Sequence, residues 1–465
     1  MRVIVESSWP VVFLMGLFSL IQSTQTTMFV ATMYPYMKKL HAEASEHNFG
    51  IIVTTAGIGH CIGCAALGYW SSVTDKMKWP MMVGFVLTLA SNFVYLMLEM
   101  VPRGGVFYIL VFARFLAGLG LGNTTTMRTC AVASSSSDDR SKAMAVVAGG
   151  RALGVVVGPA LQLIFLLVLG EDGISLPIIN LHSNNAPAVL GIILTLFGLL
   201  FSLHPFVQVE EYAVAESMKN MEDDENYPEP DRIAMFVCVL TRYVQHFTQI
   251  GLETLAPVYI MMMFSVRREE AVGTISSIFL ATGVISSALY IAMISSGLSS
   301  LINTRKCNIA VLLVFIGYLL STYQWHFLQH YVKQSTADGL DGGCDFAKFP
   351  WCWDLNTSSE WVFFVGYMIS FGACVPFLTV TDATLFSKLL NPLQQAAQQS
   401  LFDISSTFAK VVAPVLVTAI YTYYGPRRVW EVLLVQLIVT AGFWIGFSKR
   451  MVPLHPKPRP VFTLW

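Results

Sequence analysis

Residues Ala113 to Cys130 read ARFLAGLGLGNTTTMRTC, an apolar, glycine-rich run that carries two arginines. Arg114 and Arg128 are separated by alternating helical steps of four and three residues. They therefore share one face of a helix and lie about 21 Å apart along its axis. A charged side chain inside a bilayer costs at least a few kcal/mol, so each arginine needs a partner or a polar cavity.

The composition of the whole chain agrees with this placement in lipid. The chain has 465 residues, of which 55% are apolar and 12% are charged, well outside the range of soluble domains. Its apolar runs of about 20 residues can each cross a hydrocarbon core about 30 Å thick. The sequence thus predicts an integral membrane protein. The net charge of −1 and the lack of a long basic patch argue against nucleic acid as a partner.

Twelve apolar runs predict an all-α membrane protein with twelve transmembrane helices. They lie near residues 11–37, 48–70, 80–101, 106–132, 142–169, 187–206, 233–263, 271–296, 307–328, 360–386, 396–422 and 429–448. Six form an N-terminal half (1–206) and six a C-terminal half (233–448). The acidic segment between them (207–232) is expected to be a cytosolic linker, and residues 449–465 a cytosolic tail. Two such halves are typical of a parallel repeat about an axis along the membrane normal.

The orientation follows from the basic residues of the loops. Lysine and arginine are moderately enriched in the loops that face the cytosol if the N-terminus lies inside, with the first span as an uncleaved anchor. The loop 330–359 then faces the lumen or the exterior. It contains the glycosylation candidate Asn356, in an Asn-Thr-Ser sequon, and the disulfide candidate Cys344 and Cys352. Both features suit an oxidising, glycosylating compartment.

Several ionisable residues lie well inside the spans and are candidates for contact with a solute or for lining a cavity. The cavity candidates are Arg114, Arg151, Lys410 and Asp403. For Arg114 a cavity or gate is favoured over a structural interhelical pair, and for Asp403 and Lys410 both interpretations stay open. Residues near the span ends are expected to reach the headgroups instead; these are Glu99, Arg128, Arg242, Asp382 and Lys388. For Arg128 a gate is an equal alternative.

Glu253 is the candidate for proton coupling. It precedes an alanine-proline pair by three residues, and a proline inside a membrane helix leaves a carbonyl without its helical partner. Burial disfavours the charged form of a carboxylate unless a cation lies close, so such a group could bind and release a proton. His60 lies near Cys61 and Cys64, but these residues on a glycine-rich helix are more often packing residues than metal ligands. We expect no metal and no cofactor.

The segment Gly149 to Gln162 reads GGRALGVVVGPALQ, with small residues at helical spacing. Glycines at steps of four let two helices approach closely, and a proline bends a membrane helix. Gly154, Gly158 and Pro159 are therefore candidates either for tight packing or for a hinge that moves during alternating access.

These residues resemble the major facilitator superfamily, whose pattern includes a glycine-rich fourth span with RxxxG (Arg114 to Gly118), a glycine-proline fifth span and six plus six spans. Within this superfamily, the chain resembles the lysosomal subfamily of major facilitator superfamily domain-containing protein 8. This subfamily is linked to a neuronal ceroid lipofuscinosis. The matching stretches are ARFLAGLGLGN, RALGVVVGPALQ, TLFSKLLNP, AKVVAP and YYGPR. One departure concerns the loop after the second span, where Ser72 replaces the family's aspartate and Asp75 follows three residues later. Asp75 is thus a further gate candidate.

The resemblance implies a transmembrane transporter or an anion conductance of endolysosomal membranes, with the plasma membrane as another location. Deep cationic side chains outnumber deep acidic ones, which favours a small anionic solute. The first hypothesis is a proton-linked or facilitative transporter of such a solute. The alternatives are a chloride-conducting, channel-like protein of the same fold and a non-transporting membrane scaffold or sensor. No nucleophile and base pair or phosphate-binding loop stands out, so we do not expect an enzyme.

Overall fold

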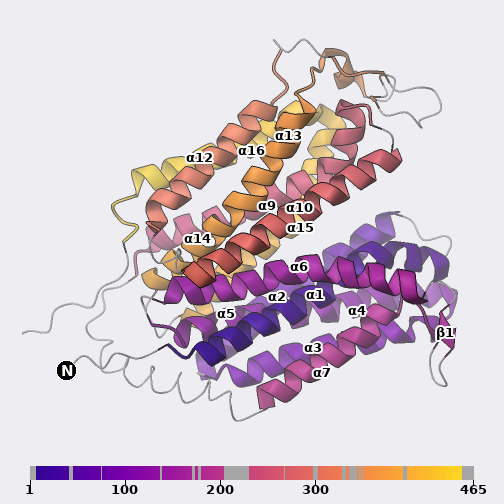
Figure 1. Cartoon of the computed structure of the whole chain (residues 1–465), viewed down its shortest axis with the longest axis vertical. Coiled ribbons are helices and arrows are strands. Elements are labelled where there is room, and N and C mark those ends of the chain that lie inside the picture. Colours follow the sequence, from indigo (N-terminus) through magenta and orange to yellow (C-terminus); the bar gives the residue numbers. More distant parts are fainter. Residues whose placement is uncertain are drawn as a thin grey trace, which may run out of the picture.

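The computed structural model describes residues 7–40, 46–74, 76–136, 139–169, 173–175, 180–203, 230–266, 268–296, 302–326, 331–334, 343–344, 346, 349–390 and 395–452. Within this part of the chain, 10 helical segments are long and apolar enough to cross a membrane. The shorter apolar helix α7 and the 32-residue helix α9 bring the helical passages to twelve. The predicted all-α membrane fold is confirmed (Figure 1).

The N-terminal half contains six of these passages. They are α1 (Trp9–Leu40), α2 (Glu46–Thr74), α3 (Lys78–Leu96) with the 3-10 turn η1 (Met97–Met100), α4 (Val106–Leu121) continued by α5 (Asn123–Ala133), α6 (Arg140–Leu169) and α7 (Ala186–Leu203). A second 3-10 turn, η2 (Arg103–Gly105), precedes α4. Before α7, the strands β1 (Ile174–Ser175) and β2 (Asn180–Leu181) pair in antiparallel fashion.

The C-terminal half contains the other six passages. They are α9 (Arg232–Met263), α10 (Arg268–Ser296), α12 (Thr304–Thr322), α13 (Glu360–Tyr367) continued through η5 (Met368–Cys374) by α14 (Val375–Leu389), α15 (Gln395–Tyr424) and α16 (Pro426–Gly446). The segment η5 is π-helical, a geometry that often marks functional sites. A 3-10 turn, η4 (Pro350–Asp354), lies in the loop before α13.

Each half has its own apolar core. Phe18 and Phe85 are buried together in the N-terminal half, with ring centroids 5.2 Å apart in an edge-on arrangement. In the C-terminal half the indoles of Trp430 and Trp444 are fully buried, and their ring nitrogens donate to Thr322 and Thr241. Figure 1 shows the two groups of helices, with α6 and α15 along the boundary between them. Across this boundary α15 packs on α2, and α10 packs on α6.

The glycines between Ala113 and Cys130 bring α4 close to α2. A Cβ atom at Gly118 would overlap the main chain of Ala56, and one at Gly122 would overlap that of Gly63. Gly122 also separates α4 from α5, although the two segments form one continuous membrane passage. This close approach fixes the face of α4 that carries Arg114.

Candidate functional site

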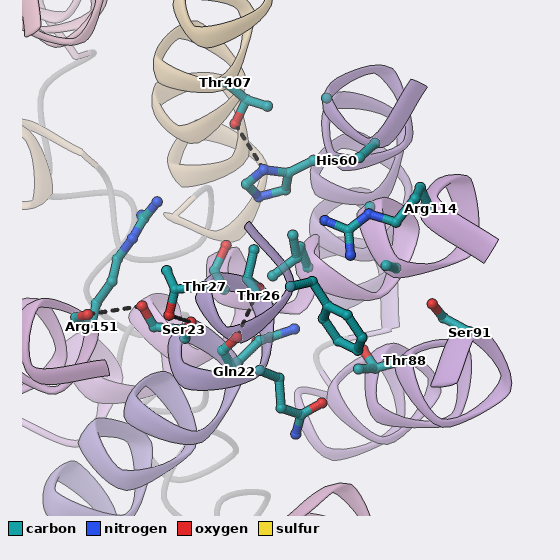
Figure 2. A pocket seen from close by; sticks show the side chains of 18 of the residues that line it. Gln22, Ser23, Thr26, Thr27, His60, Thr88, Ser91, Arg114, Arg151 and Thr407 are labelled. Atoms are coloured by element: carbon teal, nitrogen blue, oxygen red, sulfur yellow. Dashed lines mark hydrogen bonds between the residues drawn. The ribbon is translucent and has the colours of Figure 1, made fainter. Parts of the chain in front are cut away.

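A polar cavity of about 320 Å³ lies inside the N-terminal half and reaches α15 of the other half (Figure 2). Seven helical segments contribute to it: α1, α2, α3, α4, α5, α6 and α15. Its polar and charged lining residues are Ser19, Gln22, Ser23, Gln25, Thr26, Thr27, His60, Thr88, Ser91, Asn92, Tyr95, Arg114, Thr124, Arg151, Thr407 and Lys410. Among the described residues, the lining includes three cationic side chains and no carboxylate. Because opposite charges attract, this cavity favours an anionic solute.

Arg114 lies on the α4 side of the cavity. Its guanidinium carbon is 5.5 Å from the centroid of the Phe29 ring, a cation-π distance. The Nε atom is buried and has no hydrogen-bond partner. Tyr95, another lining residue, is its titratable neighbour among the described residues. In the described part of the chain, no carboxylate pairs with Arg114.

Arg151 and Lys410 lie on the side of the cavity that borders the C-terminal half. Arg151 comes from α6 and Lys410 from α15. The two charges repel each other, and each is also attracted by Asp403. No ion pair or hydrogen bond between described residues involves either side-chain nitrogen. The structure therefore brings together three of the four predicted cavity residues, namely Arg114, Arg151 and Lys410.

Neutral polar side chains line the cavity between these cations. Gln22 donates from Nε2 to the Gly120 carbonyl at 3.0 Å, while its Oε1 atom is buried without a partner. The Gln25 carbonyl oxygen accepts hydrogen bonds from Asn92 at 3.4 Å and from Thr195 at 3.1 Å. Sequence reasoning missed these residues. The signal was present in the helical spacing of Ser19, Gln22, Ser23 and Thr26 within an apolar span.

Glu253 does not line this cavity. It lies on α9, where Gln249 donates to its Oε1 atom at 2.9 Å, and Tyr367 also forms a hydrogen bond with its carboxylate. Tyr367 is the last residue of α13, directly before the π-helical segment η5. The charge of Glu253 acts on Lys410. Lys410 thus lies between the proton-coupling candidate and the cavity.

The fourth predicted cavity residue, Asp403, instead forms an ion pair with Arg128. Arg128 belongs to α5 and Asp403 to α15, so the pair joins the two halves. The side chains are nearly buried, with exposed fractions of 10% and 6%. Arg128 therefore lies at the interface between the halves, where a gate would be, and not among the headgroups.

Two further charged residues are buried, contrary to the expectation that they would reach the headgroups. Arg242 on α9 is 2% exposed and Asp382 on α14 is 0% exposed. The guanidinium carbons of Arg242 and Arg128 lie 5.3 Å and 5.9 Å from the centroid of the same ring, that of Phe402. Their positions near the ends of apolar runs gave no indication of this burial. The ring beside Arg242 comes from α15, a segment far along the chain, and hydropathy does not reveal such a contact.

Apolar contacts also join the two halves at the end of the interface that contains the Arg128–Asp403 ion pair. The sequence predicts this end to be cytosolic. Tyr290 and Met293 of α10 pack with Ala145 of α6 and Val380 of α14. The next residue of α10, Ile294, packs against a cluster that includes Val12, Ala143 and Val146. Arg140 Nη1 also donates to the Ser387 carbonyl at 3.4 Å. This end of the bundle is closed by ionic and apolar contacts between the halves.

Gly154 and Gly158 lie against α1 within the N-terminal half. A Cβ at Gly154 would come within 2.7 Å of the Leu20 carbonyl oxygen, and one at Gly158 within 2.9 Å of the Thr24 carbonyl oxygen. Thr27 donates to the Gly154 carbonyl at 3.1 Å. Pro159 follows inside the same helix. These contacts correspond to the tight-packing interpretation. A hinge at Gly154, Gly158 and Pro159 stays a prediction.

The loop before α13 contains the remaining candidates. Cys344 and Cys352 are joined by a disulfide. Asn356 is buried, and its Nδ2 atom donates to the carbonyls of Trp325 at 3.2 Å and His326 at 3.0 Å. Asp75, the gate candidate, lies outside the described residues. Among those that are described, no group of three His, Cys, Asp or Glu side chains could hold a metal ion.

Two halves of six helical passages, with a cavity lined by polar residues inside the N-terminal half, characterise the fold, and comparison with known proteins identifies its family. The sequence profile described as "Major Facilitator Superfamily" matches residues 13–335, more than half of the chain. The chain belongs to this family.

Particular relatives agree with this assignment. The chain is 24% identical over 488 residues to "Major facilitator superfamily domain-containing protein 8" of Xenopus laevis, covering 97% of this chain and 93% of that protein. The resemblance to this subfamily seen in the sequence is thus confirmed. The solved structure of the proton:xylose symporter XylE has a TM-score of 0.67 at 13% identity and covers 94% of this chain and 95% of that chain. The human organic anion transporter MFSD10 has a TM-score of 0.61 at 13% identity, over 94% and 98% of the two chains. These structures share the fold.

Proposed function

We propose that the protein is a transporter that moves a small anionic solute through the cavity lined by Arg114, Arg151 and Lys410. The observation that carries this proposal is the presence of three cationic side chains around one cavity of about 320 Å³, whose described lining residues include no carboxylate. Burying uncompensated cations is costly unless an anion enters the site during function. The volume lies at the low end of ligand pockets, which suits a small metabolite.

Glu253 is the group we propose to couple transport to a proton. Its carboxylate is hydrogen-bonded to Gln249 and Tyr367, and its charge acts on Lys410 at the edge of the cavity. Protonating Glu253 would remove the negative charge next to Lys410, and the attraction of Lys410 for an anionic solute would rise. Binding of the proton and of the anion would therefore favour each other, as linkage requires.

The ion pair of Arg128 and Asp403 is the proposed gate at the predicted cytosolic end. In alternating access, one half rocks against the other around a central site. Release of the solute at this end requires the pair to separate, together with the contacts of Tyr290 and Met293. The structure thus corresponds, in this proposal, to the state that is closed toward the cytosol.

We place the protein in endolysosomal membranes on the strength of its resemblance to the domain-containing protein 8 subfamily. In this orientation the loop with Cys344 and Cys352 faces the lumen. Glycosylation at Asn356 stays a prediction. Because Nδ2 of Asn356 donates to two carbonyls, attachment of a glycan requires the loop to release this side chain during folding.

The proposed function is tested in two stages. Metabolites are compared in endolysosomes from cells with and without the protein, and uptake of each accumulated anion is then measured in proteoliposomes. Wild-type protein should take up at least one such anion with saturation, while Arg114→Gln and Arg151→Gln should each lose at least tenfold. The matched control is Arg428→Gln, which removes an exposed arginine paired with Glu431 at the surface. Accumulation of no anion, or equal uptake by all variants, would refute the proposal.

The same three cations would also attract chloride, so a channel-like chloride pathway is the second candidate. A voltage-driven chloride current that does not saturate and that Glu253→Gln leaves unchanged would favour the channel. Wild-type cell behaviour after combining Arg114→Ala with Glu253→Gln would instead favour the non-transporting scaffold or sensor.

A further inference from the structure

We infer that the solute carries two anionic groups, one at each end of a polar, hydroxylated body, with one end at Arg114 and the other at Arg151 and Lys410. This inference rests on the proposed function and names its substrate class. It follows from how the charges are distributed around the cavity and not from their number alone.

The cations form two separate sites. Arg151 and Lys410 act on each other electrostatically, and both are influenced by Asp403. Arg114 takes no part in that group, because its titratable neighbour in the described part of the chain is Tyr95. Figure 2 shows Arg114 and Arg151 on opposite sides of the cavity. A solute with one anionic group could compensate one of these sites and would leave the other cation buried without a partner.

The side chains between the two sites are neutral and form hydrogen bonds. The buried Oε1 atom of Gln22 has no hydrogen-bond partner among the described residues and is an acceptor for a hydroxyl of the solute. Ser23 and Thr26 also line the cavity from α1, and Thr88 and Ser91 do so from α3. An unsatisfied buried acceptor is destabilising, so a body with hydroxyl donors fits this stretch better than a hydrocarbon.

The two ends also differ in character. Arg114 lies over the ring of Phe29 and beside Tyr95, within one half. Lys410 belongs to the other half, whereas Arg151 belongs to the same half as Arg114. A solute held at both ends would therefore contact both halves at once. This contact would couple occupation of the cavity to the rocking of the halves.

The test uses three six-carbon compounds of one series, in which carboxylates replace the terminal CH2OH groups: sorbitol with no carboxylate, gluconate with one and glucarate with two. Binding is measured by protection of the full-length protein in lipid nanodiscs against thermal unfolding, at constant ionic strength to hold screening fixed. We expect glucarate to bind at least about tenfold more tightly than gluconate, the scale of one charge-assisted contact. Sorbitol should bind more weakly than either.

Variants locate the two ends. Arg114→Gln and Arg151→Gln should each reduce glucarate affinity to about that of gluconate, while Arg428→Gln should leave the ranking unchanged. Where a glutamine variant does not fold, Arg114→Lys keeps the charge and should retain the preference for glucarate. Gluconate and glucarate affinities within about twofold in the wild type, or no binding of any of the three, would overturn the inference. Transport of a singly charged anion would overturn it as well and would leave the proposed function intact.

Discussion

Arg128 of α5 and Asp403 of α15 form a buried ion pair that joins the two halves of the protein. The Phe402 ring lies 5.9 Å from the guanidinium carbon of Arg128 and 5.3 Å from that of Arg242. Asp403 therefore compensates one of two arginines that share an aromatic neighbour. Its second oxygen, Oδ2, is buried without a hydrogen-bond partner.

Replacing Asp403 by Asn should open the predicted cytosolic end more often. The change leaves the Arg128 charge buried without its partner, which costs about 3–5 kcal/mol in comparable pairs. Cysteines introduced at Ala145 and Met293, which lie in one buried cluster, should crosslink more slowly in the variant than in the otherwise wild-type chain.

The control for this prediction is the charge reversal Arg128→Asp combined with Asp403→Arg. This double variant should recover part of the crosslinking rate, because it restores opposite charges across the interface. Equal rates in the wild type and in Asp403→Asn would show that the pair does not hold this end closed.

The spans could be predicted from the sequence because each apolar run must match the thickness of the bilayer. Arg242 and Asp382 show where such reasoning stops. Both lie near the ends of apolar runs, where a charged side chain can reach the headgroups, yet both are buried. Their burial depends on how α9, α14 and α15 pack, and hydropathy along one helix carries no information about its neighbours.

Gly154→Ala should destabilise the N-terminal half. The added Cβ would lie within 2.7 Å of the Leu20 carbonyl oxygen and 2.9 Å of the Thr24 amide nitrogen, so α1 and α6 would have to separate. Overpacking of this kind costs about 1–3 kcal/mol. The measurement is the thermal unfolding midpoint of the purified protein.

Gly442→Ala on α16 is the matched control, because nothing lies within 4 Å of the Cβ position there. This change should leave stability unchanged or raise it by up to about 1 kcal/mol, the helix preference for Ala over Gly. Similar midpoints for both variants would contradict the close packing of α1 on α6.

Glu253→Gln should abolish the response of uptake to a pH gradient. Without a gradient, the variant should still exchange solute across the membrane largely as the wild type does. Glutamine keeps the hydrogen-bonding shape beside Gln249 and Tyr367 and cannot release a proton. Uptake is compared in proteoliposomes with and without an imposed gradient. A full gradient response in the variant would exclude Glu253 as the coupling group.

The candidate site was predicted only in part. Charge inside an apolar span singled out Arg114, Arg151 and Lys410, since no other simple reason places a cation there. Asp403 satisfied the same rule, yet it lies against Arg128 and not in the cavity. Neutral residues such as Gln22 and Gln25 escaped notice, because a polar amide in a membrane helix is common and its direction depends on the helix rotation that tertiary packing sets.

The central claim is that Arg114 and Arg151 hold an anionic solute in the cavity. The most direct measurement is saturable uptake, into proteoliposomes, of an anion that accumulates in endolysosomes without the protein, compared among the wild type, Arg114→Gln, Arg151→Gln and Arg428→Gln. The account predicts at least a tenfold loss in the first two variants and wild-type uptake in the third. Unchanged uptake in Arg114→Gln and Arg151→Gln would contradict it.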